Sequence, residues 1–196
     1  MNVIILRSNP IAPDPRVEKE ARSLAKSGYS VKAMGWDRTG LLPKLEKKDD
    51  YLIFRLTIRA KYGSGIMNLP ALLRWQLGLM WWLIKNKNSY KIIHACDFDT
   101  ILPALIMKIF FNKNVIYDIF DFYADHLRKT PKFLKNLIRK VDFWAIKKSD
   151  GVILVDDSRR LQIAGAKPKE LIIIYNSPED IYLETKKKQK IEKDYK

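Results

Sequence analysis

The chain has 196 residues, which is long enough for one domain with a complete core and a short extension. Its composition, 47% hydrophobic and 30% charged, excludes an intrinsically disordered chain. The net charge of +15 favours an anionic partner and leaves nucleic acid, anionic lipid and a phosphorylated substrate open.

The single cysteine, Cys96, excludes an internal disulfide and is typical of a reducing compartment, so we expect a cytoplasmic protein. The first residues, from Met1 to Arg7, lack the pattern of a signal peptide. No apolar run reaches the roughly 20 residues that a membrane span needs. The nearest candidate, Leu69 to Ile84, is short and contains Arg74 and Gln76.

The first third of the chain predicts a βαβ unit. Val3 to Leu6 is a continuous apolar run, typical of a strand buried on both faces. Asp14 is placed to cap a helix that Gly28 ends, and Val31 to Trp36 forms the next strand. A strand, a helix and a strand in this order indicate an α/β protein.

The same alternation continues to about residue 180. We expect further strands at Tyr51 to Ile58, Lys91 to Ala95, Asn114 to Asp118, Gly151 to Val155 and Leu171 to Tyr175. We expect helices at about Asn68 to Lys87, Thr100 to Phe111, Pro131 to Lys148 and Ser158 to Ala164, with Asp37 to Asp50 as a polar connection. These elements predict a Rossmann-like, doubly wound, mostly parallel sheet of about seven strands with helices on both faces. Residues 1–180 form this domain, and 181–196 are a lysine-rich tail or linker.

Two of the helices have unusual surfaces. The helix from Asn68 to Lys87 is apolar nearly all round, so it is either enclosed in a core or inserted in an interface. The helix from Pro131 to Lys148 has a basic polar face, as expected of a helix on an anionic bilayer or simply of a solvated surface.

Parallel sheets bind ligands beyond the carboxyl ends of their strands, so each polar strand exit is a candidate site. The first exit, Ser8 to Arg16, offers amides and a helix amino end to a phosphate or carboxylate, or is an ordinary capped loop. It lacks the glycines of a dinucleotide fingerprint or a P-loop.

The fourth exit runs from His94 to Asp99. Asp97 or Asp99 is placed to cap the next helix, and Asp97 to face the cleft. We expect His94 to be a hydrogen-bonded structural residue. A metal site made from His94, Cys96 and Asp97 lacks its remaining ligands, and we predict no metal.

The fifth exit carries Asp118, Asp121, Asp125 and His126. A carboxylate among other carboxylates and aromatic rings can act as a general base because its pKa is raised. The alternative is a solvated acidic loop in which Asp118 pairs with a lysine, and the residues alone leave both readings open.

An ordered set of segments resembles family 4 glycosyltransferases of the GT-B fold. The segments are Asp14-Pro15-Arg16-Val17-Glu18-Lys19-Glu20-Ala21, Ile93 to Asp97, Ile116 to Tyr123, Ser149 to Val155 and Ile173 to Pro178. They stand in family order over about residues 1 to 180, which makes the set more specific than any one segment.

The resemblance implies the amino-terminal, acceptor-binding half of a two-domain retaining enzyme. Such an enzyme transfers a sugar from a nucleotide-sugar donor to a glycan or lipid-linked acceptor. The donor would be held mostly by a carboxyl-terminal GT-B domain, so this half alone should be inactive. The resemblance also implies no cofactor, with the nucleotide sugar as co-substrate.

The resemblance marks the residues expected at the site. Many relatives have His-Glu where this chain has Phe120-Asp121, so Asp121 becomes the expected polar contact. We predict Asp121 and Asp97 as catalytic residues. The residues expected to bind acceptor or donor are Asn9, Asp14, Arg16, His94, Asp118, Phe120 and Tyr123.

Partners and rival functions follow from the same features. Charge, apolar helix and family habit together favour a peripheral position on the cytoplasmic face of an anionic membrane. A nucleic-acid partner is disfavoured because no recognised motif accompanies the charge. The alternative function is a non-catalytic, basic membrane-surface or accessory subunit of a split glycosyltransferase.

Overall fold

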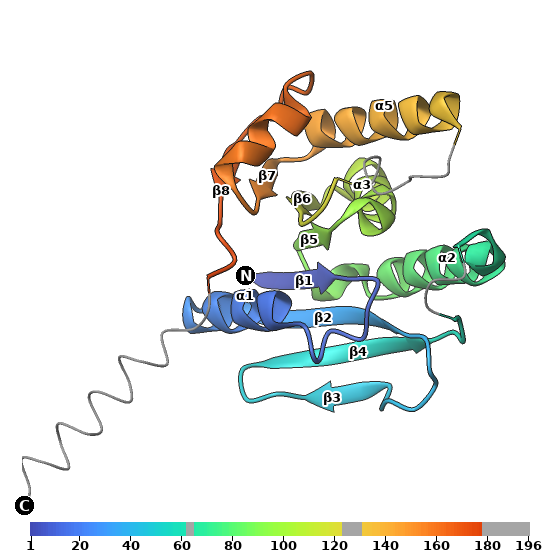
Figure 1. Cartoon of the computed structure of the whole chain (residues 1–196). Coiled ribbons are helices and arrows are strands. Elements are labelled where there is room, and N and C mark those ends of the chain that lie inside the picture. The colour runs from blue at the N-terminus through green and yellow to red at the C-terminus, as the bar shows by residue number, and fades with distance from the viewer. Residues whose placement is uncertain (62–64, 123–130, 178–196) are drawn as a thin grey trace, which may run out of the picture.

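An eight-stranded sheet in the order β3-β4-β2-β1-β5-β6-β7-β8 forms the centre of the computed structural model, which describes residues 1–61, 65–122 and 131–177 (Figure 1). The strands are β1 Asn2–Leu6, β2 Ser30–Asp37, β3 Leu45–Lys47, β4 Tyr51–Thr57, β5 Ile92–Cys96, β6 Asn114–Ile119, β7 Gly151–Leu154 and β8 Leu171–Ile173. All neighbouring strands pair in parallel except β3, which runs antiparallel to β4. The predicted α/β class and mostly parallel sheet are confirmed.

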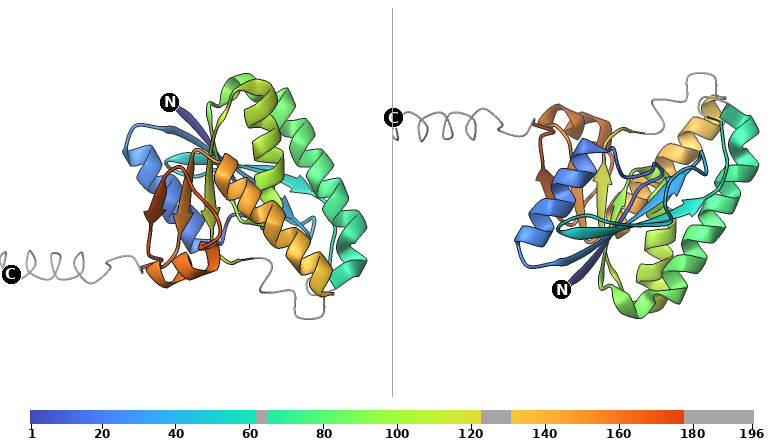
Figure 2. Two further views of the ribbon diagram at one scale, coloured as in Figure 1. Left: turned by 90° about the horizontal axis from the view of Figure 1, so that it is seen from above. Right: turned by 90° about the horizontal axis from the view of Figure 1, so that it is seen from below.

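In the described residues, four α-helices cover the two faces of this sheet. They are α1 Pro15–Lys26, α2 Leu69–Lys85, α3 Phe98–Phe111 and α5 Lys132–Lys148. Helix α1 lies on one face, and α2, α3 and α5 lie on the other (Figure 2). Short 3-10 helices occupy Gly65–Asn68, Lys87–Ser89 and Asp157–Ile163.

Two predicted segments differ from the structure. The connection from Asp37 to Asp50 contains an extra strand, β3, because Glu46 forms ion pairs with Arg55 of β4 and with Lys48. Edge strands this short carry too few residues for a periodic pattern to show. The short helix after β7 is a 3-10 helix, Asp157–Ile163, and Asp156 caps it by accepting a hydrogen bond from the Ser158 amide.

Side chains on the two faces of the central strands pack into two separate hydrophobic cores. On β1, Ile4 and Leu6 pack under α2 and α3, whereas Val3 and Ile5 pack under α1. Burial on both faces explains why this strand reads as a continuous apolar run and not as an alternating one.

Helix α1 begins and ends as its sequence predicts. The Asp14 side chain accepts a hydrogen bond from the Val17 amide at 3.3 Å, and Pro15 takes the first helical position. Gly28 follows the helix with φ of 85°, a left-handed conformation that glycine adopts without a Cβ clash. This helix places Arg16 and Glu20 over the carboxyl half of the sheet.

Helix α2 is buried in the core on one side and exposed on the other. Trp75 is fully buried, and its ring stacks on Trp36 with centroids 5.4 Å apart. Trp81, on the opposite side of the helix, is 61% exposed. Among the described residues, no helix combines the length and apolar character needed to cross a bilayer.

Candidate functional site: a crevice where the strand order reverses

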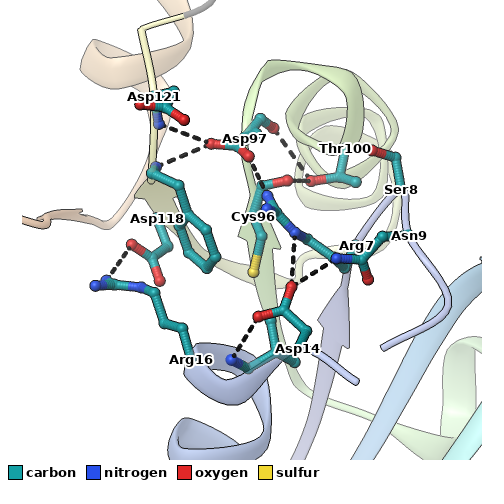
Figure 3. A network of polar contacts seen from close by, with 12 residues as sticks. Arg7, Ser8, Asn9, Asp14, Arg16, Cys96, Asp97, Thr100, Asp118 and Asp121 are labelled. Atoms are coloured by element: carbon teal, nitrogen blue, oxygen red, sulfur yellow. Dashed lines mark hydrogen bonds and ion pairs between the residues drawn. The ribbon is translucent and has the colours of Figure 1, made fainter. Parts of the chain in front are cut away.

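The strand order reverses at β1, which lies between β2 and β5. The chain leaves β1 toward α1 on one face and leaves β5 toward α3 on the other. We call the edge of the sheet beyond the carboxyl ends of these strands the crevice. Ligands of open α/β sheets bind at this topological position. Arg7, Asp97 and Asp121 follow β1, β5 and β6 here (Figure 3).

Asp97 is the hub of the crevice. Its Oδ2 forms an ion pair with Nη1 of Arg7. Its Oδ1 accepts hydrogen bonds from the backbone amides of Phe120, at 2.9 Å, and Asp121, at 3.3 Å. Arg7 in turn contacts Asp14 through Nε at 3.3 Å. One carboxylate therefore holds the ends of β1 and β6 together.

The backbone of Asp97 is strained. Its φ of 65° with ψ of 170° lies in a region that is almost confined to glycine. Asp97 occupies the N-cap position of α3, but its side chain makes no capping hydrogen bond, so the predicted cap by Asp97 is absent. The reason is that one carboxylate oxygen binds Arg7 and the other accepts from the Phe120 amide. Burial raises the pKa of Asp97, and Arg7 acts against that rise.

A second, more buried network lies beside the first. Arg16 Nη2 is 2.9 Å from Oδ1 of Asp118, and Arg16 Nη1 donates to the carbonyl of Ile174 at 3.0 Å. Oδ2 of Asp118 is 3.0 Å from Nε2 of His94. Glu20 lies 3.0 Å from Arg16 Nε, an ion pair without hydrogen-bond geometry, and 3.6 Å from His94 Nε2. Asp118 is fully buried, so it serves to position Arg16 and His94.

Burial sets the protonation of this network. It raises the pKa of Glu20 to about 7, with the nearby Asp118 charge adding to the rise and His94 and Arg16 opposing it. Burial alone would lower the pKa of His94, but the hydrogen bond to Asp118 and the Asp118 and Glu20 charges outweigh it and raise the value. Glu20 therefore changes charge close to neutral pH.

Phe120 joins the two networks. The Arg7 guanidinium carbon lies 4.2 Å from the centre of its ring, and the Arg16 carbon lies 4.5 Å away. The ring thus sits between two cations, an arrangement that fixes both guanidinium groups. Phe120, which the sequence shows to depart from the resemblance, thus forms a cation–π bridge.

An open groove of about 1030 Å³ runs from this network along the α1 side of the sheet. Its floor is aliphatic and includes Ile92, Ile116 and Ile153 from three adjacent strands. Arg16 and Glu20 stand at its polar rim. Helix α1 forms one wall of the groove, which includes Lys19, Ser23 and Leu24.

The buried network also brings potential metal ligands together. One ligand atom each of Glu20, His94, Cys96 and Asp118 lies within 4.8 Å of the others. This group shares His94 and Cys96 with the predicted alternative but not Asp97. The Arg16 guanidinium already pairs with both carboxylates, and burial raises the pKa of the Cys96 thiol, so a divalent cation is disfavoured there.

The structure gathers most of the predicted site residues at one edge of the sheet. Those present are Asn9, Asp14, Arg16, His94, Asp97, Asp118, Phe120 and Asp121. Asp121 has a 56% exposed side chain whose Oδ1 lies 3.3 Å from Arg159. Tyr123, together with Asp125 and His126, falls outside the described residues.

Three residues of the site were missed by reading the sequence. Arg7 directly follows β1, and Glu20 stands four residues after Arg16 on α1, so strand-exit position and helical spacing could have indicated both. Arg159 is brought to Asp121 across 38 residues, and no local pattern announces that contact.

The comparisons with known proteins concern the fold. No protein-family model matches the chain, and no curated protein sequence matches it. The solved structure of sucrose-phosphate synthase from Thermosynechococcus elongatus superposes with a TM-score of 0.69 at 12% identity, over 89% of this chain and 48% of that one. A shorter chain of the same synthase gives 0.68, at 12% identity, over 100% of both chains.

Two further structures with bound nucleotides are similar. UGT89C1 of Arabidopsis thaliana, in complex with UDP-L-rhamnose, has a TM-score of 0.57 at 11% identity, over 91% of this chain and 53% of its own. The E. coli trehalose-6-phosphate structure bound with UDP-2-fluoro glucose has 0.53 at 11% identity, over 84% and 42%. The chain thus spans about half the length of these full-length neighbours. At these identities the similarity establishes a Rossmann-like fold of the GT-B type.

Proposed function

We propose that this chain is the acceptor-binding, amino-terminal half of a retaining family 4 glycosyltransferase. The carrying observation is the crevice at the reversal of strand order, where Arg7, Asp97 and Asp121 converge from three strands. The GT-B fold of the neighbours supports a role in glycosyl transfer. The domain occupies residues 1–180, with 181–196 leading toward a carboxyl-terminal half.

In this proposal the two carboxylates of the crevice have different tasks. Asp97 fixes the start of the β6 exit through the amides of Phe120 and Asp121, and so positions the Asp121 side chain. The exposed Asp121 carboxylate accepts a hydrogen bond from the acceptor hydroxyl and orients it toward the donor sugar. Asn9 and Asp14, on the first exit, line the same crevice.

The donor is a nucleotide sugar that spans the cleft between this half and its partner domain. Three of the neighbours' structures contain UDP, UDP-L-rhamnose or UDP-2-fluoro glucose, which supports a UDP-sugar as the first donor to test. Arg7 and Arg16 are paired with Asp97 and Asp118 and packed against Phe120, so in this proposal they position the crevice residues. The reaction needs no cofactor in this proposal.

The acceptor is a glycan or a lipid-linked sugar, and the protein works in the cytoplasm at an anionic membrane face. The alternative, a non-catalytic accessory subunit, is favoured by Phe120 in the place of a histidine. Both functions require acceptor binding, but only the first requires transfer.

Transfer by the assembled enzyme separates the two functions. The chain is co-expressed with the products of its neighbouring genes and supplied with labelled UDP-glucose and a membrane lipid extract. We expect label in the lipid or glycan fraction only when a partner is present. Binding of lipid-linked sugars without transfer under any donor would favour the accessory subunit, and absence of both would remove the proposal.

A further inference from the structure

Helix α2 exposes an apolar stripe along its whole length. Leu69, Leu73, Leu77, Trp81 and Ile84 follow one another every three or four residues, and their side chains are 49%, 56%, 72%, 61% and 41% exposed. Residues at this spacing lie on one side of a helix. The buried residues Trp75, Leu79 and Leu83 occupy the opposite side, against the sheet. The stripe therefore points away from the domain.

The neighbouring helices extend this surface. Helix α3 lies beside α2 (Figure 2), and α5 packs against α3. The exposed large apolar residues of these two helices are Leu102, Ile106, Ile109, Phe110, Phe133, Leu134, Leu137 and Trp144. Together with the α2 stripe they form what we call the outer helical face. Exposed apolar patches this extensive are unusual on a monomer and mark an interaction surface.

The exposed charge on these three helices is mostly positive. Helix α2 contains no acidic residue, and the one acid of α5, Asp142, is fully buried and accepts a hydrogen bond from Tyr117. Asp99, the one acid of α3, lies in its first turn at the crevice end. The basic residues of the three helices are Arg74, Lys85, Lys108, Lys132, Lys135, Arg139, Lys140, Lys147 and Lys148, of which Lys108 is paired with Asp150.

We propose that the outer helical face docks on an anionic lipid bilayer. Apolar side chains with two exposed tryptophans enter the headgroup boundary, and the basic residues around them meet the lipid charges. A second copy docked by the same face would bring two positively charged surfaces together. The inference deepens the membrane part of the proposed function and does not depend on glycosyl transfer.

Vesicle binding tests the proposal directly. The protein is sedimented with vesicles of phosphatidylcholine alone and of phosphatidylcholine with phosphatidylglycerol, at low and at high salt. We expect binding to the anionic vesicles, weakened by salt, with a blue shift of tryptophan fluorescence from Trp81 and Trp144.

Two exposed positions on α2 carry the decisive variants. Leu77→Glu and Trp81→Glu each remove one inserting side chain and add a negative charge, so each should weaken binding by about tenfold or more. Leu41→Glu is the matched control, because Leu41 is 86% exposed in the loop between β2 and β3. It should bind like the wild type, and thermal unfolding should be unchanged in all three.

Three results would overturn the proposal. The first is the absence of binding to anionic vesicles. The second is equal binding by the Leu77 and Trp81 variants and the wild type. The third is a stable dimer that Trp81→Glu dissociates, in a wild-type protein that does not bind vesicles. None of them touches the transfer assay, so the surface and the glycosyltransferase proposal fail independently.

Discussion

The two faces of the sheet differ in what they bury and what they expose. On the α1 side, charged residues are buried: Arg16, His94 and Asp118 are almost fully buried and neutralise one another beneath the crevice. On the side of α2, α3 and α5, the core is apolar and apolar residues also face outward, Trp81 among them. Burial of charge serves a site that needs fixed geometry, whereas exposure of apolar surface serves a contact with something outside the domain.

The comparison predicts its largest effect inside α2. Trp75→Ala removes a fully buried ring that stacks on Trp36, and should lower the free energy of unfolding by about 3 to 5 kcal/mol. Trp81→Ala, on the exposed side of the same helix, should change it by less than about 1 kcal/mol. Denaturant titrations of both variants decide the matter. Similar losses would show that the two sides of the helix do not differ as described.

The buried charges of the α1 side give the next effect. Asp118→Ala leaves Arg16 and His94 without their shared counter-charge and should cost about 3 kcal/mol of stability. Asp121→Ala, three residues on but at an exposed side chain, is the control and should change stability by about 0.5 kcal/mol at most. Equal stability of the Asp118 variant and the wild type would mean that the network does not hold the site.

A feature of the fold could be predicted from the sequence when the residues that determine it lie close together in the chain. The strands and α1 were predictable because buried parallel strands are continuously apolar, and because Asp14, Pro15 and Gly28 act within a few residues of themselves. The short edge strand β3 was not, since its stability comes from the Glu46–Arg55 pair across a hairpin.

The site shows the same division. Strand-exit reasoning brought Asp97, Asp118 and Asp121 to one edge, because parallel strands end together. It could not show that Asp118 is buried under Arg16, a contact between residues 102 positions apart. Nor could it show which side of α2 faces outward, because a helix that is apolar all round has no pattern to read.

The buried Glu20 on the α1 side of the sheet should make the free energy of unfolding depend on pH. The pKa of Glu20 rises from 4.5 to about 7 on folding, so the folded state holds its proton more tightly than the unfolded state. Its contribution to stability is therefore present below about pH 4.5 and lost as the pH rises through about 7. The raised pKa of His94 acts in the same direction.

Glu20→Gln isolates this contribution. Between about pH 5 and pH 8, the variant should lose less stability than the wild type, by about 2 kcal/mol after allowance for the partly exposed side chain. The measurement is denaturant unfolding at several pH values. Parallel pH profiles for the variant and the wild type would contradict the raised pKa.

The smallest effect concerns the bridge between the networks. Phe120→Leu keeps an apolar side chain but removes the ring between Arg7 and Arg16, and should cost about 1 kcal/mol of stability. It should also lower acceptor affinity, because Arg7 holds Asp97, which positions Asp121. Thermal unfolding and titration with lipid-linked sugars provide the readouts. A variant with wild-type stability and affinity would show that the contacts of the ring with Arg7 and Arg16 contribute to neither.

The central claim is that the crevice at the strand-order reversal orients an acceptor for glycosyl transfer. The most direct test is the rate of sugar transfer from labelled UDP-glucose by the chain assembled with the proposed partner half, compared with the same assembly carrying Asp121→Ala. Our account predicts transfer by the wild type and a loss of about 100-fold or more in kcat/KM for the variant, with unchanged stability. Equal rates in the two assemblies would contradict it.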